Sequence, residues 1–356
     1  MPVLNLDRDP IALLRALIDI ESVSGNETEI AGAIEAALRP YRHLAVTRDG
    51  NVVLARTALG RGSRVVIAGH IDTVPVANNL PSRVTTGHDG VVVWGRGACD
   101  MKGGVAVQLA AAAALTQPAR DLTWIFYDCE EVEASRNGLA RIGRERPNDL
   151  AGDFAVLCEP SNARVEGGCQ GTMRIEVNLR GVAAHSARAW MGRNAVHEAA
   201  SVLQRLAEYQ PAEVEVDGLR YREGLNAVRI TGGVAGNIIP DRCDIEINYR
   251  FAPDKSPEEA ENHVRQVLAG FPLEVTDVAA GARPGLDRPA AKEFVAAVGG
   301  EPSAKFGWTD VAMFSAMGVP AVNFGPGNPS KAHADDECCP AVDVIACRDA
   351  LVRWLT

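Results

Sequence analysis

The chain has 356 residues, 47% of them hydrophobic, and carries a formal net charge of −10 at pH 7. This length favours two domains, and the acidity argues against a nucleic-acid partner. The sequence contains neither a signal peptide nor an apolar run of about 18 residues, so we expect a cytoplasmic protein with no membrane partner. Its eight cysteines include no Cys-x-x-Cys pair and should stay reduced and buried.

The first part of the chain alternates apolar strands with helical segments. Asp9 followed by Pro10 is typical of a helix start and predicts a helix over residues 10–20. Further helices are expected at 28–38 and 101–116, and buried strands at 64–68, 122–127, 154–158 and 321–324. Strands that alternate with helices indicate an α/β sheet with helices on its faces.

The middle of the chain has a different order of elements. Strands are expected at 173–179, 227–230, 243–250 and 273–278, and helices at 194–209 and 256–268, the second of which should begin with a capping box at 256–259. This β-α-β-β-α-β order is that of a ferredoxin-like unit. We therefore expect residues 171–280 to form a separate domain, inserted into a sheet domain made of residues 1–170 and 281–356.

Residues that commonly bind metals follow four of the predicted strands. They are His70, Glu131, Glu159 and His333, and Asp100 adds a fifth directly before a predicted helix. The carboxyl ends of strands in an open α/β sheet meet at one edge, where sites form. Taken singly, Asp100 could only cap its helix, and the others could be turn or surface residues. Their order, position and ligand type agree, which favours a metal site.

The motifs in this chain resemble those of the M20 metallopeptidase family. The string at 69–75, GHIDTVP, is similar to the first family motif, and strings at 95–97, 100–104, 130–131, 159–161 and 332–333 match the others in order. The resemblance covers essentially the whole chain. It implies the mixed sheet of zinc peptidases, flanked by helices, with the inserted domain as a lid and dimerisation domain. Cys129 departs from the family, where many members carry Asp or Glu, but this position is not a ligand.

The resemblance implies a centre of two zinc ions, and the same ligand types also accept cobalt or manganese. Asp100 would bridge both ions. His70 and Glu159 would complete one site, and Glu131 and His333 the other. Each ion would then have three protein ligands and an open position, which is the arrangement expected of catalytic zinc.

Two further residues are implied to serve the chemistry beside the metals. Glu130 would be the general base that takes a proton from the attacking water. Asp72 would accept the other ring N–H of His70 or support the base. The resemblance also implies a cis peptide bond between Asp100 and Met101.

The inserted domain and one late loop carry the remaining candidate residues. By resemblance, His185 enters the active site of the partner subunit of a homodimer and stabilises an oxyanion, although alone it could be a surface histidine. Arg250 suits a substrate carboxylate by bidentate pairing, and Asn237 matches a second substrate contact. Asn328 is a further candidate for contact with substrate.

The resemblance implies a small N-acyl amino acid as substrate, and five strings indicate which one. Residues 126–131, 166–172, 221–225, 307–312 and 322–327 resemble the branch of the family, of actinobacterial type, that hydrolyses the succinyl amide of N-succinyl-LL-2,6-diaminopimelate. The alternatives are an acetylornithine deacetylase or another aminoacylase or dipeptidase. A non-catalytic metal-binding or ligand-binding protein is the alternative from another class, and the intact Glu130 argues against it.

Overall fold

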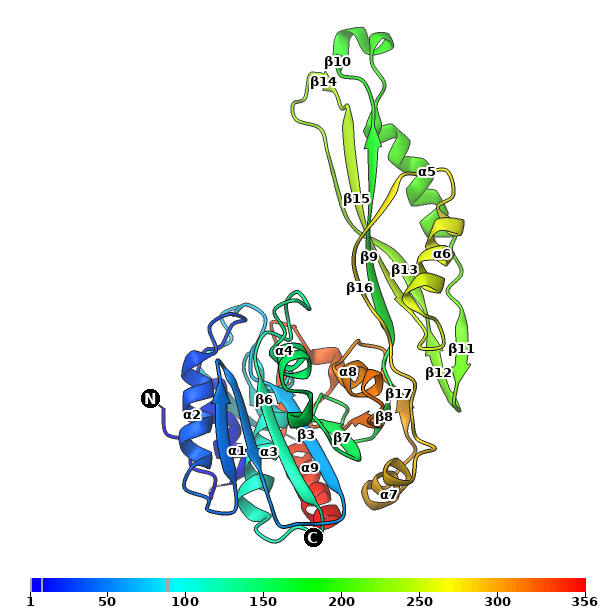
Figure 1. Ribbon diagram of the computed structural model, residues 1–356. Coiled ribbons are helices and arrows are strands. Elements are labelled where there is room, and N and C mark those ends of the chain that lie inside the picture. The colour runs from blue at the N-terminus through cyan, green and yellow to red at the C-terminus, as the bar shows by residue number, and fades with distance from the viewer. Residues whose placement is uncertain (1, 8, 88–89) are drawn as a thin grey trace. The chain divides into compact units, whose positions relative to one another are not determined.

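The computed structural model describes residues 2–7, 9–87 and 90–356, which form two compact units (Figure 1). The first unit comprises Met1–Gly167, Pro284–Ser303 and Thr309–Thr356, and the second comprises Gly168–Arg283 and Ala304–Trp308. Within the described ranges, no helix is both long and apolar enough to cross a bilayer. The eight cysteines, all in the described ranges, form no disulfide, and seven of them are buried.

The first unit is built on a mixed sheet, as predicted. Its strands in spatial order are β1 (Ala45–Asp49), β2 (Val52–Arg56), β6 (Asp121–Tyr127), β3 (Arg64–His70), β7 (Phe154–Leu157), β18 (Ala321–Asn323), β8 (Glu166–Gly167) and β17 (Ser303–Ala304). The four central strands β6, β3, β7 and β18 are parallel, whereas β1, β2 and β8 pair antiparallel. The carboxyl ends of the central strands therefore share one edge of the sheet.

Helices cover both faces of this sheet. One core cluster joins the sheet to α1 (Pro10–Ile18), α2 (Thr28–Leu38), α3 (Lys102–Ala114), α7 (Pro289–Val298) and α9 (Ala341–Leu355). The helices α4 (Gly138–Glu145) and α8 (Val311–Ala316) lie on the opposite face (Figure 1). Every residue of β6 is buried, as expected for a strand covered on both sides. The predicted start of α1 is confirmed, because the Asp9 side chain accepts a hydrogen bond from the Ile11 N–H.

A small antiparallel sheet in the first unit was not predicted. It consists of β4 (Arg83–Gly87), β5 (Gly90–Trp94) and β19 (Cys338–Pro340). The short helical turns η1 (Pro147–Asp149) and η3 (Pro329–Lys331) also belong to this unit. The pairing of β5 with β19 brings the segment after His333 beside the segment that precedes Asp100.

The second unit has the predicted ferredoxin-like order of elements. Its sheet has the order β13 (Gly224–Gly232), β15 (Arg242–Phe251), β9 (Gly171–Arg180) and β16 (Leu273–Ala279), all antiparallel. The helices α5 (Ala195–Glu208) and α6 (Pro257–Val267) pack on one face over a core that includes Ile175, Val177 and Ile247. The predicted capping box of α6 is present, because Ser256 and Glu259 bond reciprocally.

Additional short elements extend the second unit beyond the predicted order. The hairpin of β11 (Glu213–Val216) and β12 (Leu219–Arg222) lies between α5 and β13 in the chain. A two-residue ladder joins β10 (Ala184–His185) to β14 (Ile238–Ile239), and the turn η2 (Ser186–Met191) follows β10. Each of these strands is only two to four residues long, although β11 and β12 alternate polar and apolar residues on either side of Asp217-Gly218, a hairpin signal that the prediction missed.

Candidate metal centre

The predicted ligands of the first unit lie on loops at the carboxyl edge of the central strands. His70 is the last residue of β3, Glu131 follows β6, and Glu159 follows β7. His333 comes at the end of the loop after β18, and Asp100 precedes α3. The Asp100–Met101 peptide bond is cis, as predicted, and Asp100 does not cap α3, whose N-cap is Met101.

The contacts of these side chains fall into two sets that share Asp100. His70 Nε2 lies 3.0 Å from Asp100 Oδ1 and 3.9 Å from Glu159 Oε1. His333 Nε2 lies 2.9 Å from Glu131 Oε2 and 3.5 Å from Asp100 Oδ2. Each oxygen of Asp100 therefore faces a different histidine, which is the geometry that a bridging carboxylate requires.

The chemistry of this group suits divalent transition metals. Ligand atoms of His70, Asp100 and Glu131 all lie within 4.8 Å of one another. Imidazole and carboxylate donors in a partly buried site match zinc, and they also accept cobalt or manganese. The residues present therefore fit a metal centre.

The two histidines are strong proton acceptors in the metal-free chain. Burial disfavours the charged ring of His70, but hydrogen bonds to Asp100 and Asp72 outweigh it and raise its pKa well above 6.5. Hydrogen bonds to Asp100 and Glu131 raise the pKa of His333 to about 10. A metal ion requires the neutral imidazole, so metal binding here would displace a proton from each ring.

Asp72 connects the loop of His70 to the loop of Glu130 and Glu131. It is fully buried, and its carboxylate accepts hydrogen bonds from the backbone N–H groups of Glu130 and Glu131, both at 3.1 Å, and from Ser24 Oγ at 2.7 Å. His70 Nδ1 lies 3.1 Å from the Asp72 carbonyl oxygen and 3.4 Å from Oδ1. One carboxylate thus orients a histidine and the backbone of both glutamates.

Glu130 lies among charged groups that shift the pKa of its carboxyl. Burial raises the pKa of its carboxyl well above the usual value, the charge of His70 opposes this shift, and Glu159 and Glu131 add to it. A carboxyl group with a raised pKa that adjoins candidate metal ligands has the properties of a general base or acid.

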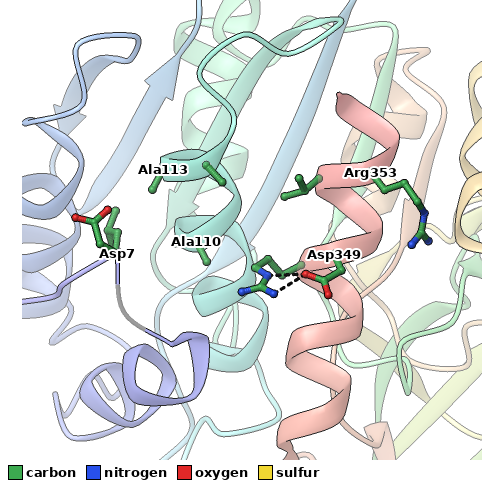
Figure 2. A pocket seen from close by; sticks show the side chains of 9 residues that line it. Asp7, Ala110, Ala113, Asp349 and Arg353 are labelled. Carbon is green, nitrogen blue, oxygen red and sulfur yellow. Dashed lines mark hydrogen bonds and ion pairs between the residues drawn. The ribbon is translucent and has the colours of Figure 1, made fainter.

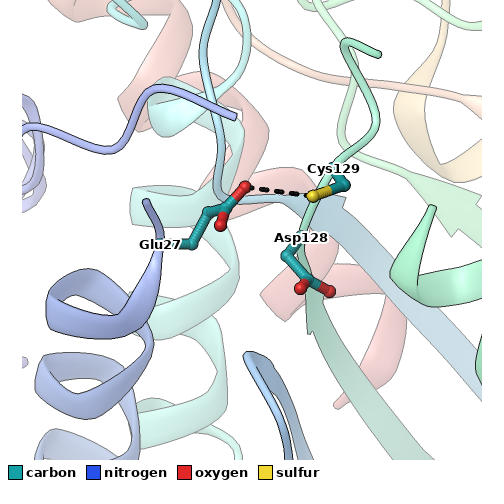
Figure 3. A group of neighbouring side chains, drawn as sticks. All are labelled: Glu27, Asp128 and Cys129. Carbon is teal, nitrogen blue, oxygen red and sulfur yellow. Dashed lines mark hydrogen bonds between the residues drawn. The ribbon is translucent and has the colours of Figure 1, made fainter. Parts of the chain in front are cut away.

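Cys129 holds the turn that precedes Glu130. Its φ of +58° lies in the left-handed region, which is uncommon for a residue with a side chain. Its thiol donates a hydrogen bond to Glu27 Oε1 at 3.4 Å, and that oxygen also accepts from the Gly25 N–H at 2.7 Å (Figure 3). Burial, together with the charge of Glu27, raises the pKa of Cys129 to about 12. The protonated thiol therefore acts as a hydrogen-bond donor that fixes the turn.

The candidate residues of the second unit lie in two places, at the β10–β14 ladder and on β15. His185 and Asn237 lie close together, because β10 pairs with β14 and the Asn237 carbonyl accepts a hydrogen bond from the Ser186 N–H. Arg250 pairs with Thr172 near the other end of β15. At ~3.4 Å per residue, Arg250 lies roughly 27 Å along the strand from Arg242, where β15 begins.

The side chains of these three residues differ in their surroundings. His185 is exposed, and its Nδ1 accepts a hydrogen bond from the Ala187 N–H at 3.0 Å, which leaves Nε2 to carry the proton. Asn237 is also exposed. Arg250 is half-buried, and its Nε donates to Asn248 Oδ1 at 3.2 Å. Burial and the neighbouring charge of Arg174 lower the pKa of Arg250.

Asn328 lies on the loop that leads to His333. Its carbonyl oxygen accepts a hydrogen bond from the Cys99 thiol at 3.0 Å, and its side-chain oxygen accepts from the Ser330 N–H. The structure thus places Asn328 beside the residue that precedes Asp100.

Sequence reasoning missed three buried charged residues near the site. Glu337 accepts hydrogen bonds from the backbone N–H groups of Cys99 and Asp100, and Lys102 Nζ donates to the Ile20 carbonyl at 2.7 Å. Asp310 accepts from Asn137 Nδ2 at 3.0 Å and is fully buried. Lys102 and Asp310 do belong to strings that resemble the family, whereas Glu337 follows the last matched motif and carried no signal of its own.

A cavity of about 570 Å³ elsewhere in the first unit contains none of the predicted site residues (Figure 2). It lies between α3 and α9, and Ala110, Ala113 and Arg348 are among the residues that line it. Arg348 is paired with Asp349 at 2.6 Å. The candidate metal centre is therefore separate from this cavity.

Comparisons with known proteins give one consistent family. Residues 66–356 match the model of peptidase family M20/M25/M40. A Mycobacterium tuberculosis protein that bears the name DapE is 53% identical over 356 residues and covers 99% of both chains. The succinyl-diaminopimelate desuccinylase of Corynebacterium glutamicum is 48% identical over 366 residues, covering 100% of this chain and 98% of the relative.

The fold agrees with a solved structure of lower sequence identity. A tripeptidase from Staphylococcus aureus superposes with a TM-score of 0.78 at 20% identity, over 99% of this chain and 98% of its own. At this level of identity the likeness concerns the fold alone. On the family model and the full-length relatives, the chain belongs to peptidase family M20/M25/M40 and is a metal-dependent amidohydrolase.

Proposed function

We propose that this protein hydrolyses the succinyl amide of N-succinyl-LL-2,6-diaminopimelate to LL-2,6-diaminopimelate and succinate. The observation that carries the proposal is the 48% identity over its full length to a relative named for this reaction. The reaction belongs to lysine and diaminopimelate synthesis, for which we propose a cytoplasmic location.

We propose that the metal centre holds two zinc ions. His70 and Glu159 would bind one ion, Glu131 and His333 the other, and Asp100 both; the two sets of contacts that share Asp100 support this division. Bound zinc polarises a substrate carbonyl and makes water more acidic. A donor set of imidazoles and carboxylates fits zinc but does not exclude cobalt or manganese.

The proton steps are assigned to Glu130. Its carboxylate would take a proton from the attacking water and then deliver it to the nitrogen of the leaving amine. Asp72 would hold the base in place, since its carboxylate accepts the backbone N–H of Glu130. Arg250 would pair with a carboxylate of the substrate, and Asn237 and Asn328 would supply further polar contacts.

A homodimer through the second unit is part of the proposal. The edge strand β13 exposes Val228 at 58% and Ile230 at 49%, and α5 exposes Val196 and Leu203. Exposed apolar side chains beside an unpaired sheet edge favour association with another chain. If β13 paired antiparallel with β13 of a second copy about a twofold axis, the backbone N–H and C=O groups of both edge strands would be hydrogen-bonded.

The positions of the candidate residues support a role for His185 in the partner's site. His185 lies in the β10–β14 ladder, which precedes the Arg242 end of β15 in the chain, whereas Arg250 lies roughly 27 Å along β15 from Arg242, so one copy of this unit does not offer both to one small substrate. A second copy of the unit could supply the missing residue. The protonated Nε2 of His185 would then stabilise the oxyanion that forms from the amide carbonyl.

A substrate panel tests the proposed function. The zinc-loaded protein should release succinate from N-succinyl-LL-2,6-diaminopimelate much faster than it deacylates N-acetylornithine or cleaves dipeptides, and removal of the metal by a chelator should abolish this release. Faster turnover of N-acetylornithine or of dipeptides would favour the corresponding alternative within the family. Metal binding without turnover of any substrate would favour a binding protein.

A further inference from the structure

A buried ion pair joins two loops of the first unit that are far apart in the sequence. Arg96 Nη1 lies 2.9 Å from Glu337 Oε2, and the side chains are 4% and 1% exposed. Arg96 lies on the loop before α3, four residues ahead of Asp100, and Glu337 lies four residues after His333. The pair therefore connects the segments that carry two of the proposed ligands.

The carboxylate of Glu337 is bound mainly by backbone. Its Oε2 accepts the N–H of Gly97 at 3.1 Å, and its Oε1 accepts the N–H groups of Cys99 and Asp100, both at 3.0 Å. Hydrogen bonds to an ionised acceptor are stronger than neutral ones and restrict geometry more tightly. One side chain thus fixes the course of the backbone into Asp100, including the N–H of Asp100 itself.

The guanidinium of Arg96 extends the connection to a third loop and contacts the loop of His333 a second time. Its Nε donates to the Pro75 carbonyl at 3.0 Å, on the loop that follows His70, and its Nη1 donates to the Ala334 carbonyl at 3.2 Å, next to His333. The loops of His70, Asp100 and His333 are therefore held by one arginine and one carboxylate.

We propose that the Arg96–Glu337 pair positions the metal centre by setting the distance between Asp100 and His333. The inference rests on the proposed metal-dependent function. A buried ion pair contributes little to the free energy of unfolding compared with apolar side chains of similar size. The role of this pair is therefore to fix the geometry of the loops that it joins. Neither residue lies among the proposed ligands, and both act as positioning residues.

The first test is Glu337→Gln, which keeps the shape of the side chain and replaces one acceptor oxygen by a donor. The metal-free protein is titrated with Zn²⁺ by calorimetry, and Co²⁺ reports coordination by its visible spectrum. Loss of a residue that orients ligands typically weakens metal binding about 10–100-fold, so we expect a weakening of this size at one of two equivalents and an altered Co²⁺ spectrum. In the zinc-loaded variant, kcat should fall with little change in KM.

Asp121→Asn is the matched control in the same unit. Asp121 is a buried carboxylate that accepts hydrogen bonds from Thr57 Oγ1 and from the N–H groups of Leu59 and Arg61, but it lies at the start of β6, at the opposite end from Glu130. This variant should lose thermal stability and bind both metal equivalents as the parent does. An equal loss of metal affinity in Asp121→Asn would mean that general destabilisation explains the effect, and would overturn the inference.

A double variant distinguishes the cost of burying an unpaired charge from the loss of ligand positioning. In Arg96→Met with Glu337→Met, neither member of the ion pair is left as an unpaired charge, so thermal stability should recover relative to Glu337→Gln, and a folded sample is available even if the single variant does not fold. Metal affinity should stay low, because the N–H groups of residues 97, 99 and 100 still lack their acceptor. Parental affinity in Glu337→Gln or in the double variant would refute positioning. Failure of the parent itself to bind two equivalents would instead refute the proposed metal centre.

Discussion

The sheets of the two units differ in how completely they are covered. Every residue of β6 in the first unit is buried, whereas β15 in the second unit alternates buried and half-buried residues and β13 exposes seven of its nine. Parallel strands covered on both faces form a closed core, but an antiparallel sheet can keep one polar face and open edges. The first unit thus covers both faces of its sheet and brings its candidate ligands together, while the second leaves most of its edge strand β13 exposed.

This difference predicts different responses to substitution. Changes at the ligand edge of the first unit should alter chemistry within one chain. Changes in the second unit should alter association, or should act on a site in another chain. The following experiments test that division.

The largest effect is expected for Glu130→Gln, which keeps size and removes basicity. We expect kcat to fall by about 10²–10⁴-fold while two zinc equivalents remain bound, because Glu130 is not a ligand in the proposed centre. Kinetics on a sample of measured metal content checks this. Turnover close to that of the parent would remove Glu130 from the role of base.

The next effect is expected for His185→Ala in the second unit. Removal of one oxyanion donor lowers kcat by about 10²–10³-fold, and metal content should not change. Mixing this variant with Glu130→Gln tests where His185 acts. If it acts in the partner's site, one site of each mixed dimer has both the base and the histidine, and activity returns. If subunit exchange is verified and no activity returns, His185 acts within its own chain.

A smaller effect on activity, but a direct effect on assembly, is expected for Ile230→Lys on β13. Symmetric pairing would bring the two introduced charges near each other, so the dimer should weaken on the order of 100-fold while zinc binding persists. Sedimentation velocity measures the dissociation. Thr276→Lys is the matched control on β16, the other edge strand, and should leave the dimer intact. Equal dissociation in both variants would argue against β13 as the interface.

The smallest effect is expected for Ser256→Ala at the start of α6. This change removes the side-chain cap that accepts from the Glu259 N–H, and should lower the free energy of unfolding by about 1 kcal/mol. Chemical denaturation followed by circular dichroism measures the change. Metal affinity should be that of the parent, and a clear drop in it would contradict the division between the units.

Elements with strong local signals could be predicted from the sequence. The apolar runs of β3, β6 and β7, the Asp9 cap of α1 and the capping box of α6 all appear in the structure. The hairpins β4–β5 and β11–β12 were missed, although β11 and β12 alternate polar and apolar residues on either side of Asp217-Gly218, which is a hairpin signal. Predictions succeeded where neighbouring residues alone determine the conformation.

By itself, the sequence determined the types and order of the candidate ligands and their positions after successive strands. Only the tertiary structure decided how they meet, with one oxygen of Asp100 toward each of two histidines. It also decided the role of Glu337, whose partners are backbone N–H groups about 240 residues earlier in the chain. Every residue but proline carries such an N–H, so no pattern of residue types marks the ones that a distant carboxylate will bind.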